Sequence, residues 1–131
     1  MIGAWLALAA AAQTTPATVS PARIAVHVRT FAGDATARRF QSAVLKELGR
    51  DPRLAIVGEA IPAAVTLSLP RGVGWERSID WIRILYQARL DTPQGGSYVI
   101  HGECWNWNQR ECGKQIADAV AEAGLAAAPR H

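Results

Sequence analysis

The chain contains few cysteines and histidines, the side chains that zinc sites and many nucleophilic active sites use. Its 131 residues include two cysteines and three histidines, and no arrangement of serine, histidine and aspartate in it suggests nucleophilic catalysis. The net charge is +3, but the basic residues are scattered, so the positive stripe of a nucleic-acid-binding protein is missing. We therefore expect no nucleic-acid partner, no catalytic residue, no metal and no cofactor.

The sequence also lacks an apolar run long enough to span a bilayer, which needs about 20 residues. Residues 1–12 (MIGAWLALAAAA) carry no charged side chain. We interpret them as a signal peptide cleaved before Gln13, because Ala10 and Ala12 supply the small residues of a cleavage site. A misassigned start site or retention as a weak anchor are alternatives, since no Lys or Arg precedes the run. The expected location is the periplasm or the medium, with no stable span after cleavage.

The two cysteines agree with export, because thiols in oxidising compartments form disulfides. Cys104 is expected at the end of a strand and Cys112 in the first turn of a helix, so we predict a disulfide worth about 2 to 3 kcal/mol for this short loop. The pattern His101-x-Glu103 followed by cysteines also resembles zinc deaminases, but those need two closely spaced thiolates after a proline. A redox role would normally use C-x-x-C. The structural disulfide is the favoured interpretation.

Length and composition predict one domain. Residues 13–22 (QTTPATVSPA) are rich in Thr, Ser and Pro and are expected to form a flexible lead. Residues 23–125 are expected to form the domain, and residues 126–131 a frayed tail.

The clearest pattern is a long hairpin between residues 79 and 112. Its first strand places alternate apolar residues on one face, namely Ile82, Ile84, Tyr86, Ala88 and Leu90. The segment Thr92–Gly96 contains a proline and two glycines that tolerate positive φ, which predicts a turn. A second strand is expected over residues 98–105.

The other elements follow from periodicity and capping residues. Strands are expected over residues 23–30, 53–58 and 63–69. Asp34 is expected to cap a helix that ends at Gly49. The apolar stripe of that helix comprises Ala37, Phe40, Val44, Leu45 and Leu48. Residues 71–78 are expected to form a loop. A last helix over residues 109–123, capped by Asn108 with Glu111 and closed by Gly124, should bury Cys112, Ile116, Ala119, Val120 and Ala123.

The expected order is therefore β-α-β-β-β-β-α. Two helices with one apolar stripe each can cover one face of a mostly antiparallel sheet, which is a two-layer α+β fold. The second face would then be solvated or covered by a partner. We expect Trp81, Leu85, Val99 and Trp105 on it, which is more apolar surface than a solvated face usually carries.

This order resembles small periplasmic α/β modules, such as the amino-terminal domain of TolB and the CsgG family. The resemblance lies in RIAVHVRTF (residues 23–31), DPRLAIVGEA (51–60), AAVTLSL (63–69) and the hairpin WIRILYQARLDTPQGGSYVI (81–100). It implies a non-enzymatic protein that docks to envelope or outer-membrane proteins, and it transfers no site residue. The chain differs in its cysteine pair and in having no lipid-attachment cysteine.

Tryptophans are the candidate binding residues, namely Trp75, Trp105, Trp107 and Trp81. Indoles interleaved with Asn106 and Asn108 suit stacking and hydrogen bonding to a protein, peptide or sugar. The alternative is that the indoles only cover the disulfide and close the end of the sheet. We expect an exported protein-binding or assembly module. A small glycan-binding or peptide-binding protein, or an enzyme that pairs the indoles with Glu76 or Glu103, is the second hypothesis, and a purely structural domain is the third.

Overall fold

The computed structural model describes residues 22–127, so the expected signal peptide and nearly all of the lead lie outside the described residues. Within this range, no helix combines the length and the apolar character that a membrane span requires. The elements, in chain order, are β1 (Ile24–Arg29), α2 (Ala35–Arg50), β2 (Leu54–Ile56), β3 (Val65–Ser68), β4 (Gly74–Arg77), β5 (Ile82–Asp91), β6 (Ser97–Trp105), the 3₁₀ turn η1 (Asn106–Asn108) and α3 (Gln109–Ala127).

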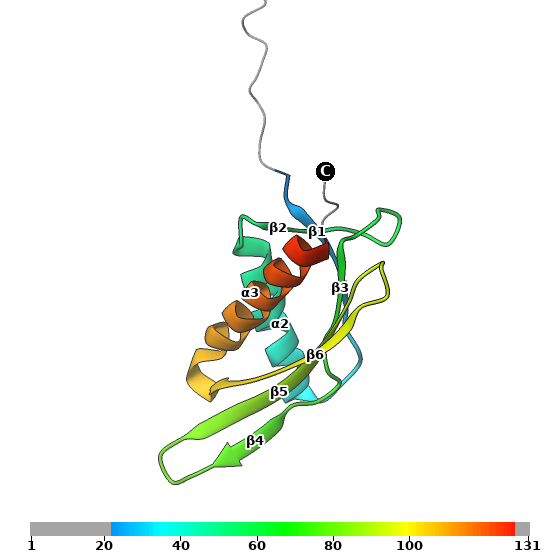
Figure 1. Cartoon of the computed structure of the whole chain (residues 1–131). Helices are drawn as coiled ribbons and strands as arrows, with labels where there is room; N and C mark the ends of the chain where they lie inside the picture. Colours follow the sequence, from blue (N-terminus) through cyan, green and yellow to red (C-terminus); the bar gives the residue numbers. More distant parts are fainter. Residues whose placement is uncertain (1–21, 128–131) are drawn as a thin grey trace, which may run out of the picture.

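The strands form one mixed sheet, and both helices pack on the same face of it (Figure 1). β1 pairs in parallel with β2 and β3. β5 is antiparallel to β3, β4 and β6. Three of the five pairings are thus antiparallel, and the predicted two-layer α+β class is confirmed.

The core lies between the sheet and the two helices. Alternate residues of β5 point into it as predicted, since Ile84, Tyr86, Ala88 and Leu90 are all buried. The helices contribute Phe40, Val44, Leu48, Cys112, Ile116 and Val120. Burial of these side chains provides the main stabilisation of a domain of this size.

Helix α2 begins as the sequence predicts and ends one residue later than expected. The Asp34 carboxylate accepts a hydrogen bond from the backbone N–H of Ala37 at 2.8 Å, which is the expected N-cap. Leu45 is only partly buried. The helix continues through Gly49 to Arg50, so the prediction that Gly49 ends it is wrong. Gly49 has an ordinary negative φ, and only Gly95, in the hairpin turn, has a positive one among the described residues.

The segment 71–78 is not a plain loop, because residues Gly74–Arg77 form β4 and pair with residues 82–85 of β5. All four residues of β4 are exposed. An exposed strand has no alternation between buried and solvated positions, and that alternation is what sequence reasoning detects. Pairing with the long β5 therefore could not be predicted from the local pattern.

Helix α3 is longer than predicted and reaches Ala127, so two residues assigned to the frayed tail are helical. Gly124 does not close the helix. A Cβ built on Gly124 would lie 2.5 Å from Cγ2 of Ile24, so this glycine lets the helix approach β1 closely. Neither Asn108 nor Glu111 forms a side-chain hydrogen bond within residues 22–127, so the predicted capping box is wrong. Ala119 and Ala123 are only partly buried.

Candidate binding surface

The sheet face opposite the helices is uncovered within the described residues (Figure 1). Because Ile84 points into the core, its neighbours Arg83 and Leu85 point to the opposite face. The β5–β6 register places Trp105 opposite Arg83, Glu103 opposite Leu85 and Val99 opposite Arg89. The expected apolar residues Leu85, Val99 and Trp105 therefore do lie on the uncovered face.

Three indole rings meet at one end of this face. Trp81 directly precedes β5, Trp105 ends β6 and Trp107 lies in η1. The rings of Trp81 and Trp105 are in edge contact, with centroids 5.6 Å apart. Those of Trp105 and Trp107 are stacked, with centroids 4.9 Å apart. Trp105 is 40% exposed and Trp107 67% exposed. We call Trp81, Trp105 and Trp107 the indole surface.

The structure does not bring the fourth predicted tryptophan, Trp75, to the indole surface. Trp75 pairs with Ile84, whose side chain is buried on the helix side of the sheet. Residues directly opposite each other in an antiparallel pair share a face, so Trp75 points away from the uncovered face. The prediction that Trp75 joins this surface is wrong, because it depended on treating β4 as a loop.

Arg83 connects two carboxylates beside the indoles. Its guanidinium binds Glu76 at 2.5 Å and Glu103 at 3.2 Å, and it lies over the ring of Trp81, 5.7 Å from the centroid. Hydrogen bonding to Glu76 raises the pKa of Arg83, and the charges of both carboxylates act in the same direction. Glu76 and Glu103 are thus both partners of the same arginine. Sequence reasoning missed Arg83.

An open pocket of about 380 Å³ adjoins the indole surface. Its walls include Trp81, Trp107 and the polar residues Ser78, Asp80 and Asn106. The pocket lies at the tip of the β4–β5 hairpin, beside η1. It combines two aromatic walls with groups that can donate and accept hydrogen bonds.

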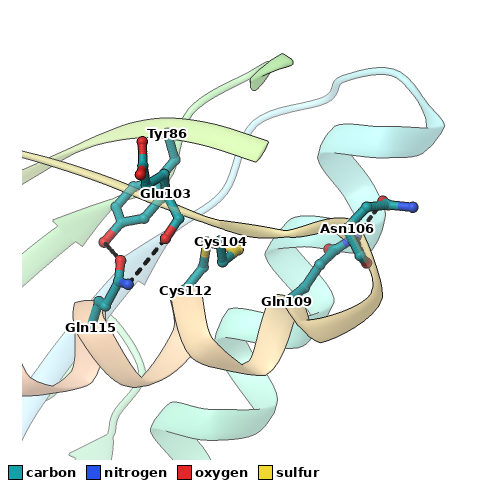
Figure 2. The surroundings of a disulfide bond; sticks show 7 residues. All are labelled: Tyr86, Glu103, Cys104, Asn106, Gln109, Cys112 and Gln115. Atoms are coloured by element: carbon teal, nitrogen blue, oxygen red, sulfur yellow. Dashed lines mark hydrogen bonds between the residues drawn. A yellow bond between two sulfur atoms is a disulfide. The ribbon is translucent and has the colours of Figure 1, made fainter. Parts of the chain in front are cut away.

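The predicted disulfide joins Cys104, near the end of β6, to Cys112, the fourth residue of α3 (Figure 2). The two Cα atoms are 5.5 Å apart, within the range that a disulfide bridges. Both cysteines are buried, and because their sulfurs are bonded to each other, neither is available as a thiolate ligand in this state. Within residues 22–127, no group of three metal-ligating side chains occurs.

A small hydrogen-bond network surrounds this disulfide (Figure 2). The hydroxyl of Tyr86 donates to Oε1 of Gln115 at 2.9 Å. The side-chain amide of Gln115 donates to the carbonyl of Glu103 at 3.1 Å. Burial raises the pKa of Tyr86 to about 12. The network and the disulfide together hold the end of β6, and hence Trp105, against α3.

The fold of residues 22–127 is that of a two-layer α+β domain, and one face of its sheet is uncovered among these residues. The sequence matches no protein-family model and no curated protein. A solved minor lipoprotein from Acinetobacter baumannii is similar in structure, with a TM-score of 0.49 and 8% identity over 77% of this chain and 92% of that chain. A PelC dodecamer from Paraburkholderia phytofirmans gives a TM-score of 0.39 and 15% identity over 87% and 95%. These distant likenesses assign no function, and the resemblance to TolB and CsgG modules stays a prediction.

Proposed function

We propose that this chain is an exported protein of the bacterial envelope that binds a protein partner through the indole surface. The observation that supports this best is the stacked pair Trp105 and Trp107, which remains exposed at the end of the uncovered sheet face. Isolated exposed hydrophobic residues are normal, but contiguous exposed aromatic patches usually mark binding sites.

The composition of the surface favours a protein as the partner. Tryptophan and arginine are enriched among the residues that contribute most to protein–protein affinity. Here the guanidinium of Arg83 lies over the ring of Trp81 and binds the carboxylates of both Glu76 and Glu103. A partner that brings apolar side chains to the indoles could therefore cover this region while the two terminal nitrogens of Arg83 keep their carboxylate partners.

The disulfide supports export. Structural disulfides are rare in the reducing cytosol of ordinary bacteria and persist in the periplasm or outside the cell. The Cys104–Cys112 bond lies in the core, where it tightens the base of the binding surface. An envelope or outer-membrane protein is the expected partner.

Site-specific photo-crosslinking in the organism that produces the protein tests this proposal. A photoreactive amino acid replaces Trp107 in one variant and Trp75 in a matched control on the other side of the sheet. We expect a discrete protein adduct from position 107, recovered from the envelope fraction, and none from position 75. Absence of any adduct at position 107, or equal adducts at both positions, would contradict the proposal.

Glycan binding is the second candidate, and the pocket beside the indoles is the observation that favours it. The walls of Trp81 and Trp107 could stack on a sugar ring while Asp80 and Asn106 hydrogen-bond its hydroxyl groups. Titration with envelope oligosaccharides, monitored by tryptophan fluorescence, distinguishes the two functions. Saturable quenching that Asp80→Ala abolishes would favour the glycan.

A further inference from the structure

Strand β6 forms an open edge of the sheet. It pairs with β5 along its whole length, from Ser97 to Trp105. On the other side of β5 lie β3 and β4, so within residues 22–127 no strand pairs with the outer edge of β6. An edge strand of nine residues is longer than proteins usually leave exposed, because its backbone can pair with another chain.

The hairpin turn identifies the backbone groups that face outward. Thr92 donates its N–H to the carbonyl of Gly96 at 2.9 Å. Hydrogen-bonded and non-hydrogen-bonded pairs alternate in an antiparallel ladder, so the register that follows directs the N–H and C=O groups of Ser97, Val99, His101 and Glu103 away from β5. The carbonyl of Glu103 confirms this, because it accepts from Gln115 of α3.

The outward groups of Ser97, Val99 and His101 have no hydrogen-bond partner within the described residues. Outward groups at every second residue are what an added β-strand needs in order to form a ladder of hydrogen bonds. Such a strand would end at Glu103, whose carbonyl is already occupied. The free part of the edge thus spans about five residues of β6.

An apolar groove runs beside this edge. Its walls are Tyr98 and Ile100 of β6 and the small residues Ala119, Ala123 and Ala126 of α3, around a volume of about 370 Å³. In Figure 1 β6, drawn in yellow, runs alongside α3, drawn in orange and red. The alanines recur every three or four residues, so they form one face of the helix and leave space between helix and strand.

A second hollow continues the groove toward the hairpin turn. It shares Tyr98, Ala123 and Ala126 with the first and adds Thr92 and Gln94. Among the described residues, the only charged side chain that lines either hollow is Glu122, and it forms no salt bridge with any other of them. The groove therefore favours a partner that carries apolar side chains and at least one positive charge.

We propose that the outer edge of β6 and the alanine face of α3 form a second binding site, for an extended peptide segment of a partner protein. The segment pairs with the outward groups of Ser97, Val99 and His101 as an added strand. Its side chains alternate between the uncovered sheet face and the groove. Apolar side chains fill the groove, and a lysine or arginine meets Glu122. This site is separate from the indole surface, so either can exist without the other.

A defined peptide tests the site on the purified, oxidised protein. The probe is an acetylated and amidated peptide, Lys-Val-Thr-Val-Thr-Val-Lys, and the control peptide has its three central backbone nitrogens methylated. We expect NMR shifts at the amides of Ser97, Val99 and His101 and at the methyl groups of Ala119 and Ala123, with no binding of the methylated peptide. No shifts at millimolar peptide, shifts limited to the indole surface, or equal binding of both peptides would overturn the proposal.

Val99 offers a matched pair of variants. Its N–H points outward, so Val99→Pro leaves the β5–β6 ladder intact but removes a donor to the added strand. We expect Val99→Pro to weaken peptide binding by at least about tenfold, while Val99→Ala binds within about twofold of the unchanged protein. Equal affinity of both variants would overturn the proposal.

A variant in the groove provides a second test of the site if Val99→Pro does not fold. Ala123→Arg places a long basic side chain in the groove at a partly exposed helical position, and it should abolish binding of the basic peptide. Retained binding would overturn the assignment.

A concentration-dependent dimer that Val99→Pro or Ala123→Arg abolishes would instead identify a second copy of this chain as the occupant. Trp107→Ala should leave peptide binding unchanged, which separates this site from the proposed function.

Discussion

The indole rings of Trp105 and Trp107 are stacked with an interplanar angle of 8° and centroids 4.9 Å apart. Two residues at positions i and i+2 of a continuous strand would lie on one face about 6.6 Å apart. Here β6 ends at Trp105 and the 3₁₀ turn η1 begins at Asn106, and this change of direction brings the ring of Trp107 over the ring of Trp105. The two rings therefore form one stacked aromatic unit, and Trp107 is its more exposed member.

Because Trp107 is exposed, we expect its substitution to weaken partner binding with little effect on the stability of the fold. Trp107→Ala should weaken binding of the crosslinked partner by at least about tenfold, as expected for an aromatic hot spot. Its free energy of unfolding should change by less than about 1 kcal/mol, because the ring is 67% exposed. Surface plasmon resonance and urea denaturation measure the two effects. Trp75→Ala is the control and should leave the affinity unchanged.

The disulfide predicts a redox-dependent stability. Protein purified without reductant should contain no free thiol, and reduction or a Cys104→Ala/Cys112→Ala double variant should lower the free energy of unfolding by about 2 to 3 kcal/mol. Urea denaturation with and without reductant gives the difference. Two titratable thiols in the untreated protein would contradict both the disulfide and the argument for export.

Two helical glycines should respond in opposite directions to the same substitution. Gly49→Ala should stabilise the protein by about 0.5 to 1 kcal/mol, because a Cβ there contacts nothing within 4 Å and alanine favours the helix. Gly124→Ala should destabilise it by about 1 kcal/mol, because the clash with Ile24 outweighs the helical gain. Thermal denaturation of the unchanged protein and of the two variants measures the change in stability. Stabilisation by both substitutions would show that α3 lies farther from β1 than in this structure.

Glu47 should make stability fall in acid. Burial alone would raise the pKa of Glu47, but hydrogen bonds and charges from Arg110 and Arg50 lower it below its usual value. A carboxylate with a lowered pKa stabilises the fold above its unfolded pKa, about 4.3, and this contribution disappears as the pH falls through the folded pKa. The stability difference between the unchanged protein and Glu47→Gln should therefore be largest at pH 7 and shrink below about pH 4. Urea denaturation across this range measures it, and a difference independent of pH would be inconsistent with the ion pairs.

The fold was predictable wherever one face of an element is buried. The alternation in β5, the cap at Asp34 and the short cysteine loop each carry a local signal, and the structure confirms all three. Gly49 and Gly124 misled the prediction of the helix ends. Each of the two helices has a glycine near its end, but only tertiary contacts decide whether the helix continues through that glycine.

The candidate site was only partly predictable. The sequence identified Trp81, Trp105 and Trp107, because they flank the strands of an evident hairpin. It could not place Trp75, since the face of β4 depends on its register with β5. The salt bridges of Arg83 depend on the same register, as does the open edge of β6. Pairing between strands is not encoded in any single stretch of sequence.

The most direct test of the account is ¹⁹F NMR of the protein labelled with 5-fluorotryptophan and titrated with solubilised envelope proteins of its source organism. The resonances of Trp105 and Trp107, assigned by substitution with phenylalanine, should shift or broaden, while that of Trp75 stays unchanged. Unchanged resonances for Trp105 and Trp107, or a response from Trp75 alone, would contradict a protein-binding role of the indole surface.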